Sequence, residues 1–373
     1  MTRALLDLTK MGQSIWLDYI SRSLIEKGEL TSLIQEDCVQ GVTSNPSIFE
    51  KAIGKTDDYD EMLGLLRSKG VTSAMSAYEN LVIKDIQDAC ELLRTIYERT
   101  LGVDGFASLE VSPHLAFKTN ETVQEAKRLY HVVDRPNLMI KVPGTPEGIR
   151  ATRVLISEGI NVNVTLLFSL KAYQDAAMAY LLGLKDRLER GLPIDGVQSV
   201  ASFFISRIDT KVDAQLEKIV AVSPSTNEAA ALLGKAAIAN AQMAYRSFLE
   251  IYQSDLAKGI VRQGGHAQRL LWASTSTKNP TYRDTLYVDS LIAPNTVNTL
   301  PLDTLRAYKD HGEAGDSFLK SLDKAPEIFT RLSSLGIGFE QSCHELLYEG
   351  IKLFTDAFDQ LMKAVEQKNS QAR

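Results

Sequence analysis

The segment Leu138-Met-Ile-Lys-Val-Pro-Gly-Thr145 decides the fold class. Its apolar residues are consecutive and do not alternate with polar ones, which is typical of a parallel strand covered on both faces. Pro143 and Gly144 indicate the end of this strand. Pro146 then stands at the first turn of a helix expected over Pro146–Ser157. The segment therefore predicts one strand–loop–helix unit of a parallel α/β fold.

Seven further runs of apolar or β-branched residues repeat this pattern. They are Ile15–Ile20, Gly41–Ser44, Phe106–Val111, Asn161–Phe168, Val197–Ile205, Arg269–Ser276 and, roughly, Leu286–Ala293. Amphipathic stretches at Asp85–Arg99, Glu121–Tyr130 and Leu170–Arg190 predict helices between them. No GxGxxG or GxxxxGK[ST] turn occurs, so an open nucleotide-binding sheet is disfavoured. Eight strand–helix units predict a closed (β/α)8 TIM barrel with additional helices.

The chain has 373 residues, which by length alone suggests two or three domains. A (β/α)8 barrel can use a chain of this size as one unit. We expect a single barrel domain over residues 1–373. Helical insertions are expected at about 47–105 and 209–268, and a C-terminal helical segment at about 301–373.

Charge and composition exclude several classes of protein. Lys and Arg number 41 against 47 Asp and Glu, a net charge of −6, so a chain-wide basic surface for nucleic acid is absent. No apolar run approaches the roughly 18 residues of a membrane span. The three cysteines are widely separated, without a CxxC pair, and Arg3, Asp7 and Lys10 interrupt any signal-peptide core. We expect a cytoplasmic protein that binds neither nucleic acid nor membrane.

Three ionisable residues lie late in the apolar runs, where a barrel enzyme carries its chemistry. These are Asp18, Glu110 and Lys141. Burial of Lys141 would disfavour the ammonium ion, and a neutral amine can form an imine with a ketone. The alternatives are a turn cap for Asp18, a salt bridge for Glu110 and an edge-strand position from which Lys141 reaches solvent.

Polar residues at other strand ends are candidate ligands for a substrate. Asn45 follows Val42-Thr-Ser, and residues 161, 163 and 165 point to one side of their strand. Asn45, Asn163 and Thr165 suit hydrogen bonds to sugar hydroxyls, or else turn chemistry. Arg207 and the pair Ser276 and Lys278 suit a phosphate group, although a lone strand-end Arg is usually a surface ion pair.

No metal site is predicted. The five histidines form no HxxxH or HxH pair, and no EF-hand loop is present. His114, just after Glu110, is the histidine closest in sequence to the candidate site.

Taken together, Val42-Thr-Ser-Asn-Pro-Ser47, Ile140-Lys-Val-Pro-Gly-Thr145 and Asn163-Val-Thr-Leu-Leu-Phe-Ser169 resemble the transaldolase family. The resemblance runs from about Gly12 to about Asn279 and is closest to the longer bacterial and plant-type members. It implies a metal-free, cofactor-free class I enzyme of the pentose phosphate pathway. Such an enzyme transfers a dihydroxyacetone unit from sedoheptulose 7-phosphate to glyceraldehyde 3-phosphate, giving erythrose 4-phosphate and fructose 6-phosphate.

The resemblance also implies a role for each matching residue. Lys141 would form the Schiff base, Asp18 would be the acid/base of the first strand, and Glu110 would act through a water with Thr165 beside it. The residues implied in substrate binding are Asn45, Asn163, Ser202, Arg207, Ser276 and Lys278. The partners would be sugar phosphates, and the protein would be a monomer or homodimer, with its last helix packed near the barrel mouth.

Two other functions remain open on the residues alone. A simple aldolase would release free dihydroxyacetone, as the short fructose 6-phosphate aldolases with a Lys-Val-Pro segment do. A regulator on a barrel scaffold would bind a sugar phosphate without turnover. The presence of Asp18, Glu110 and Lys141 together favours an enzyme, because binding alone requires no amine.

Overall fold

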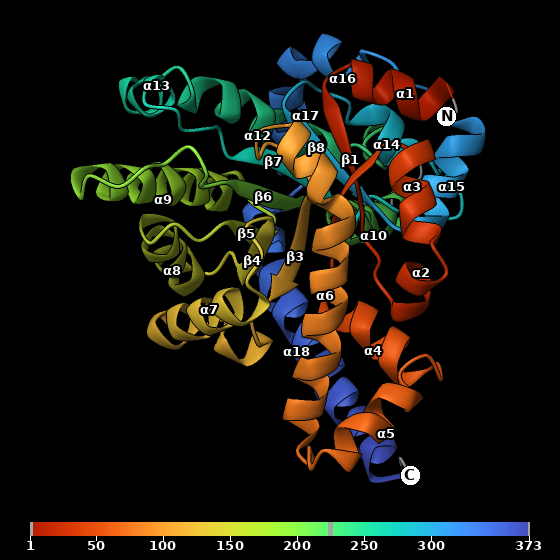
Figure 1. Ribbon diagram of the computed structural model, residues 1–373. Coiled ribbons are helices and arrows are strands. Elements are labelled where there is room, and N and C mark those ends of the chain that lie inside the picture. The colour runs from red at the N-terminus through yellow and green to blue at the C-terminus, as the bar shows by residue number, and fades with distance from the viewer. Residues whose placement is uncertain (1–2, 223–226, 372–373) are drawn as a thin grey trace.

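A computed structural model describes residues 3–222 and 227–371. Its centre is a closed barrel of eight parallel strands that follow one another in chain order (Figure 1). The strands are β1 (Gln13–Leu17), β2 (Val39–Thr43), β3 (Phe106–Glu110), β4 (Leu138–Pro143), β5 (Val162–Leu167), β6 (Ser199–Phe204), β7 (Arg269–Ala273) and β8 (Thr296–Leu300). The (β/α)8 barrel predicted from the sequence is confirmed.

The eighth strand is not the predicted run Leu286–Ala293. Leu286–Ser290 forms the short helix α14, and β8 is Thr296–Leu300, which pairs with β1 and β7. This strand contains Thr296 and Asn298, both fully buried. Thr296 Oγ1 accepts a hydrogen bond from Gln13 Nε2 at 2.8 Å, and Asn298 Oδ1 accepts one from Thr275 Oγ1 at 2.9 Å. The prediction was wrong because hydrogen-bonded polar residues in the barrel break the apolar pattern.

Helices surround the barrel, and several lie in the expected insertions. In chain order they are α1 (Arg3–Lys10), α2 (Arg22–Glu26), α3 (Glu29–Glu36), α4 (Pro46–Gly54), α5 (Asp60–Ser68), α6 (Ala74–Arg99), the 3₁₀ helix η1 (Pro113–Leu115), α7 (Thr119–Val133), α8 (Pro146–Ser157), α9 (Leu170–Glu189), α10 (Ser206–Val222), α11 (Asn227–Ala230), α12 (Ala236–Ile251), α13 (Asp255–Arg262), α14, α15 (Leu302–His311), α16 (Ser317–Lys320), η2 (Leu322–Lys324), α17 (Ala325–Ser334) and α18 (Phe339–Gln371). Intervals 47–105 and 209–268 thus contain more than one helix each.

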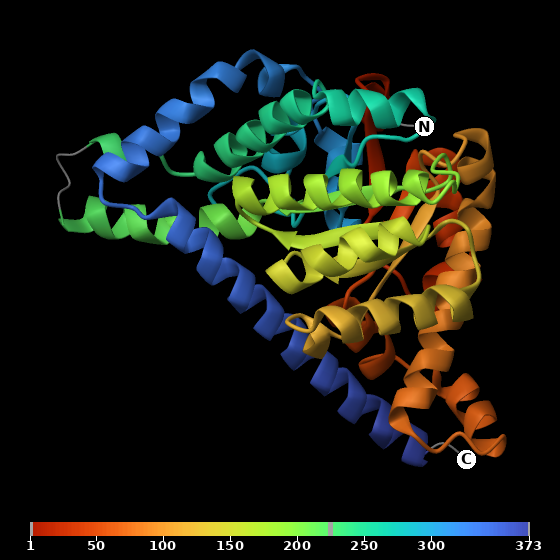
Figure 2. The ribbon, with the colours of Figure 1, turned by 90° about the vertical axis from the view of Figure 1, so that its left-hand side faces the viewer.

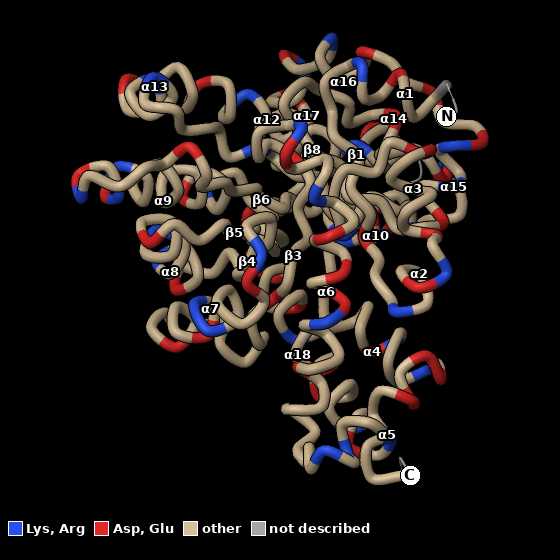
Figure 3. Tube along the Cα trace, in the orientation of Figure 1, with Lys and Arg blue, Asp and Glu red and all other residues tan. Residues whose placement is uncertain are grey.

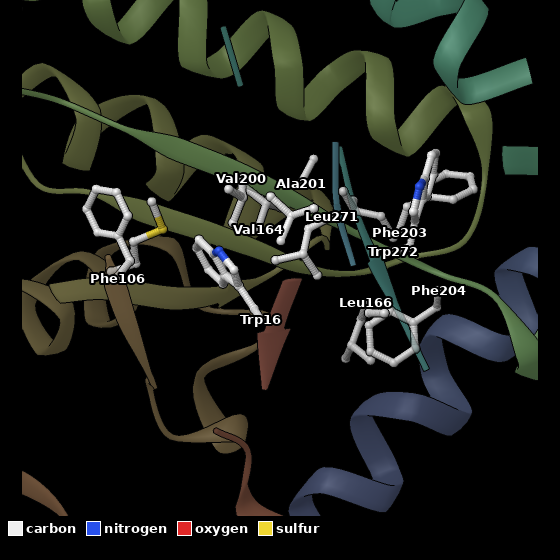
Figure 4. Close-up of a cluster of buried hydrophobic side chains, with 14 of the residues drawn as sticks. Trp16, Phe106, Val164, Leu166, Val200, Ala201, Phe203, Phe204, Leu271 and Trp272 are labelled. Carbon is white, nitrogen blue, oxygen red and sulfur yellow. The ribbon is translucent and has the colours of Figure 1, made fainter. Parts of the chain in front are cut away.

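The longest helix, α18, crosses one end of the barrel. It packs against α10, β5, η1, α4, α5 and α6. Figure 2 shows it running diagonally past the ends of α7, α8 and α9. Figure 4 shows Leu166 at the end of β5 and Phe204 at the end of β6 beside this helix. Because both residues stand at the carboxyl ends of their strands, α18 covers the end of the barrel where active sites occur.

A layer of apolar side chains fills the barrel below that end. Residues two apart in a strand point to the same side, so Trp16 lies below Asp18, and Met139 lies below Lys141. Figure 4 shows Trp16, Phe106 and Leu271 in this buried cluster. A Cβ at Gly41 would lie 2.5 Å from the Trp16 ring, so the indole fits only beside a glycine. The site described next therefore lies above a close-packed layer of largely apolar side chains.

Charged residues of both signs are interspersed over the outer helices (Figure 3). Within residues 3–222 and 227–371, none of the helices combines the length and the apolarity required to cross a membrane.

Candidate active site

A cavity of about 180 Å³ opens at the carboxyl ends of the strands. Eight of the ten residues predicted for the site line it, namely Asp18, Asn45, Lys141, Thr165, Ser202, Arg207, Ser276 and Lys278. The remaining lining residues are Thr43, Ser47, Phe204, Ala273, Ser274, Thr299, Pro301 and Phe354. Glu110 and Asn163 do not line the cavity but bond to, or lie beside, residues that do. The fold thus brings together predicted site residues that are up to 260 positions apart in the chain, from Asp18 to Lys278.

A larger groove of about 650 Å³ adjoins this cavity between α10 and α18. It shares Arg207 and Lys278 with the cavity but includes neither Lys141 nor Asp18. We place the chemistry in the smaller cavity because the buried amine of Lys141 and the carboxylate of Asp18 line it together.

Lys141 projects from the middle of a closed sheet. Its strand β4 pairs with β3 on one side and with β5 on the other, so the edge-strand alternative does not apply. The residue is only 5% exposed. Its Nζ donates a hydrogen bond to the backbone oxygen of Ser44 at 2.9 Å and lies 3.6 Å from Oε2 of Glu110. The amine is therefore buried, held by β2 and β3, and open to the cavity.

Glu110 is a buried carboxylate that lacks hydrogen-bond donors. It stands beside Lys141 in the register of β3 and β4 and is 8% exposed. Neither carboxylate oxygen has a hydrogen-bond partner among the described residues. Burial raises the pKa of Glu110 to about 7, against the opposing effect of the Lys141 charge. A carboxyl group with such a pKa can both give and take a proton near neutral pH.

Asp18 lies one residue beyond β1 and lines the cavity. Its backbone N–H donates to Leu300 O at 2.8 Å, and its Oδ1 accepts a hydrogen bond from Thr43 Oγ1 at 2.7 Å. Burial raises the pKa of Asp18, and the nearby Lys141 charge opposes this shift. The turn-cap alternative does not apply, since Ser21 caps the following helix α2.

Strands β5 and β6 contribute a short chain of polar groups. Asn163 Oδ1 accepts a hydrogen bond from Ser202 Oγ at 2.6 Å, and Asn163 Nδ2 donates to Ser108 Oγ at 3.2 Å. The Thr165 hydroxyl is buried and has no partner among the described residues. Directly after it, Leu166 has a φ of 60°, a left-handed conformation that is costly for a branched side chain. A strained backbone therefore follows an unpaired hydroxyl at the cavity wall.

Asn45 both caps the first turn of a helix and lines the cavity, so the two alternatives predicted for it hold together. Its Oδ1 accepts a hydrogen bond from Ile48 N–H at 3.1 Å, so it caps helix α4. The same residue lines the cavity, with its amide nitrogen unused by any described residue. It is thus a helix cap with a donor left for a ligand.

Arg207 and Lys278 form the positive end of the cavity. Arg207 is the second residue of α10, and its guanidinium lies 5.4 Å from the centre of the Phe204 ring and 6.0 Å from that of Phe354. Its Nη1 is buried without a hydrogen-bond partner among the described residues, so the surface ion-pair alternative does not apply. Lys278 Nζ donates to Ser276 Oγ at 2.7 Å. Burial lowers the pKa of Lys278, and the neighbouring Arg207 charge lowers it further.

Sequence reasoning missed eight of the lining residues, and three of them, Thr43, Thr299 and Phe354, contact the predicted site residues directly or through one another. Thr43 and Thr299 share a hydroxyl–hydroxyl hydrogen bond of 2.7 Å and hold Asp18. Thr43 stands two residues before Asn45 in the segment Val42–Ser47, so its position at a strand end could have identified it. Phe354 comes from α18, and no local pattern could have placed it at the mouth.

His114 does not line the cavity. It is half exposed, and its Nε2 lies 2.8 Å from Oδ1 of Asp359 on α18. Across the described residues, no group of three or more His, Cys, Asp or Glu is arranged to hold a metal ion.

Comparison with known proteins identifies the family. Residues 15–365 match the model of the transaldolase/fructose-6-phosphate aldolase family. The transaldolase of Trichodesmium erythraeum is 47% identical over 99% of this chain and 98% of its own length. Transaldolase 2 of Streptomyces coelicolor is 45% identical over 98% of this chain and 97% of its own length. The chain belongs to the transaldolase/fructose-6-phosphate aldolase family.

Proposed function

We propose that this protein is a transaldolase that moves a dihydroxyacetone unit from sedoheptulose 7-phosphate to glyceraldehyde 3-phosphate. The observation that carries the proposal is the buried amine of Lys141, 3.6 Å from the unpaired carboxylate of Glu110 in a cavity that Asp18 also lines. Relatives matched over nearly their whole length bear the name transaldolase.

The first half of the reaction forms an imine. Once it has given up its proton, the amine of Lys141 attacks the C2 carbonyl of the ketose and gives a carbinolamine. Loss of water then requires a proton on the departing hydroxyl. Glu110, working through a water held with Thr165, donates this proton and later takes one back. Its raised pKa supports this exchange, because the group changes charge near neutral pH.

The second half breaks and remakes a carbon–carbon bond. Asp18 takes the proton of the C4 hydroxyl, the C3–C4 bond breaks, and the iminium on Lys141 accepts the electron pair. The first aldose leaves, and the dihydroxyacetone unit remains on Lys141 as an enamine. The enamine attacks the carbonyl of the acceptor aldehyde, Asp18 returns the proton, and water releases the new ketose. Each positioned acid or base contributes typically ~10²–10⁴-fold to such a rate.

The remaining cavity residues bind and orient the substrate. Asn45, Asn163 and Ser202 hold sugar hydroxyls, and Arg207, Ser276 and Lys278 hold the phosphate. The unpaired Nη1 of Arg207 supports this role, since a buried donor without a partner is costly until a ligand fills it. Orienting both reactants in one cavity lowers the activation free energy. The largest effect of this kind is on the order of 7–11 kcal/mol.

The imine is testable by borohydride reduction in the presence of fructose 6-phosphate. Peptide mass mapping is expected to find the added mass of a reduced dihydroxyacetone unit on Lys141. An adduct on another lysine, or no adduct at all, contradicts the assignment.

The role of Asp18 has a separate test. Asp18→Ala is expected to form the borohydride-trapped imine normally but to cleave the C3–C4 bond about 10²–10⁴-fold more slowly. Loss of imine trapping together with cleavage would show that Asp18 acts earlier than proposed.

An aldolase that releases dihydroxyacetone is the second candidate, because the family model also covers fructose-6-phosphate aldolase. Incubation with fructose 6-phosphate alone distinguishes the two, since only the aldolase accumulates free dihydroxyacetone without an acceptor. Tight sugar-phosphate binding with no turnover would instead support the regulator. A cytoplasmic location and a monomeric or homodimeric state stay predictions.

A further inference from the structure

Two aspartates on α10 are bonded to the segment after β7, Asp213 to the loop that carries Lys278 and Asp209 to helix α14, which follows that loop. Asp209 Oδ2 accepts a hydrogen bond from Tyr287 Oη at 2.9 Å, and Asp213 Oδ2 accepts one from Tyr282 Oη at 2.7 Å. The two aspartates are four positions apart and therefore lie on one face of the helix. Arg207 stands in the first turn of the same helix. One rigid element thus carries Arg207 and both attachment points.

The second oxygen of each aspartate is bonded to the N-terminal region of α12. Asp209 Oδ1 accepts from the N–H of Ala237 at 2.8 Å, and Asp213 Oδ1 accepts from that of Gly234 at 3.0 Å. A Cβ at Gly234 would lie 3.0 Å from the Tyr282 ring, and Gly234 has a φ of 68°, so a side chain there would disturb the tyrosine. Both carboxylates are therefore fixed from two directions.

Hydrogen bonds within the loop after β7 connect its two ends. Thr277 Oγ1 donates to the backbone oxygens of Arg283 at 2.9 Å and Asp284 at 3.2 Å. Thr281 N–H donates to Asn279 Oδ1 at 3.0 Å. Because the segment 277–284 is tied at both ends, a tyrosine held on α10 also sets the position of Lys278.

The charges of Arg207 and Lys278 repel each other before a ligand binds. The Arg207 charge lowers the pKa of Lys278, as expected for two nearby cations. Two cations at a short distance suit a phosphate dianion, but a mobile lysine would move away from the arginine. The loop must therefore be held if the two charges are to stay in one cavity.

We propose that Asp209 and Asp213 are positioning residues that, through Tyr287 and Tyr282, hold Lys278 opposite Arg207 and thereby select phosphorylated over unphosphorylated sugars. This inference rests on the proposed function, since that assigns Arg207 and Lys278 to the phosphate. It concerns residues that do not line the cavity themselves.

The test is the full-length double variant Tyr282→Phe/Tyr287→Phe, which removes only the two hydroxyls. KM for glyceraldehyde 3-phosphate is expected to rise about five- to tenfold with kcat unchanged, because the two lost hydrogen bonds no longer hold Lys278 opposite Arg207. The kcat/KM for unphosphorylated glyceraldehyde is expected to stay the same. The thermal stabilisation that inorganic phosphate produces should require correspondingly more phosphate, and Arg207→Ala should abolish it.

Tyr245→Phe is the matched control, because it also removes a tyrosine hydrogen bond, the one to Pro294 O at 3.2 Å, far from the cavity. It is expected to lower stability without changing the preference for phosphorylated acceptors. An equal loss for both acceptors in the double variant, or no change in phosphate binding, overturns the proposal.

The phosphate titration keeps this test separate from that of the proposed function. If Lys141 forms no imine but the double variant still weakens phosphate binding, the positioning role stands and the transaldolase mechanism falls. If the imine forms but the wild-type protein gains no stability from phosphate, the assigned phosphate site and the positioning role fall together.

Discussion

The two ends of the barrel each contain a buried ion pair, and the two pairs are built differently. At the amino-terminal end, Asp104 Oδ1 accepts hydrogen bonds from Trp16 Nε1 at 2.8 Å and Arg269 Nη2 at 3.0 Å. Its Oδ2 accepts from Ser14 Oγ at 2.6 Å and Arg269 Nη1 at 3.2 Å. At the carboxyl-terminal end, Glu110 and Lys141 lie 3.6 Å apart, and neither Glu110 oxygen has a hydrogen-bond partner among the described residues.

Burial does not explain this difference, because Asp104 is 5% exposed and Glu110 is 8% exposed. The difference is in the number of donors. Asp104 receives four hydrogen bonds, which occupy both of its oxygens and link the segment before β3 to β1 and β7. A buried carboxylate without donors is costly, and its proton is readily exchanged near neutral pH. The first pair therefore stabilises the fold, whereas the second leaves both Glu110 oxygens, without a donor among the described residues, free to accept hydrogen bonds, which is the property that the proposed mechanism uses.

The largest effect is expected for Lys141→Met, which removes the amine from the carboxyl-terminal pair. Activity should fall on the order of 10⁴-fold or more, because no other described lysine lines the cavity except Lys278 at its far end. Stability in urea should change little near pH 7, because Glu110, left without its partner, can take up a proton, as its pKa is raised by burial and is no longer lowered by the Lys141 charge. Lys171→Met, at an exposed residue of α9, is the matched control and should leave activity unchanged. A marked loss of stability in Lys141→Met would show that both pairs are structural.

Asp104→Ala should have the opposite effect at the other end of the barrel. It leaves the Arg269 guanidinium buried without its partner, which costs about 3–5 kcal/mol of unfolding free energy. The kcat measured well below the melting temperature should remain close to wild type. Asp186→Ala breaks the exposed pair with Arg153 and should cost no more than about 1 kcal/mol. Equal urea midpoints for these two variants would contradict the comparison.

Glu110→Gln tests the pH dependence of the carboxyl-terminal pair. The pKa of Glu110 is raised from an ordinary 4.5 to about 7, so its favourable contribution to stability is present below pH 4.5 and is lost as the pH rises through 7. The variant should therefore gain stability relative to wild type between pH 5 and pH 8, by at most on the order of 3 kcal/mol. Urea unfolding at several pH values measures this gain.

The same variant should remove an inflection near pH 7 from the rate of imine formation. Glu366→Gln, at an exposed residue of α18, should change neither profile. If the difference in unfolding free energy between wild type and Glu110→Gln does not depend on pH, Glu110 keeps one protonation state throughout this range.

The smallest effect is expected for Gly350→Ala on α18. The new Cβ would lie 2.9 Å from Leu166 Cδ2 and 3.5 Å from Arg207 Nη1. The methyl group should shift Arg207 and raise KM for phosphorylated substrates a few-fold. The free energy of unfolding should change little, because the gain of about 1 kcal/mol from the higher helix propensity of Ala is offset by crowding against Leu166. Gly259→Ala on α13 has no atom within 4 Å of its Cβ and should stabilise without changing KM. Identical KM values for the two variants would show that α18 does not restrain Arg207.

Much of the cavity could be predicted because strand ends are recognisable in a parallel fold. Pro143 and Gly144 indicated where β4 ends, and this placed Lys141 at the mouth. The same reasoning failed at β8, where Thr296 and Asn298 are bonded to Gln13 and Thr275 from other strands. Thr299 was missed for this reason. Phe354, Tyr282 and Tyr287 could not be predicted either, because their roles depend on how α18 and the loop after β7 pack on α10.

The barrel, the family resemblance and most of the polar residues at the strand ends could be read from the amino-acid sequence alone. These features are local, since a strand's burial, its terminating Pro or Gly and its last polar residue occur within about ten positions. Only the tertiary structure decided which carboxylate receives donors and which does not. Asp104 and Glu110 are acids at opposite ends of β3, and their difference arises from Arg269, Trp16 and Ser14, all from distant strands. Hydrogen bonds between such segments leave no pattern in the chain, because they depend on closure of the barrel.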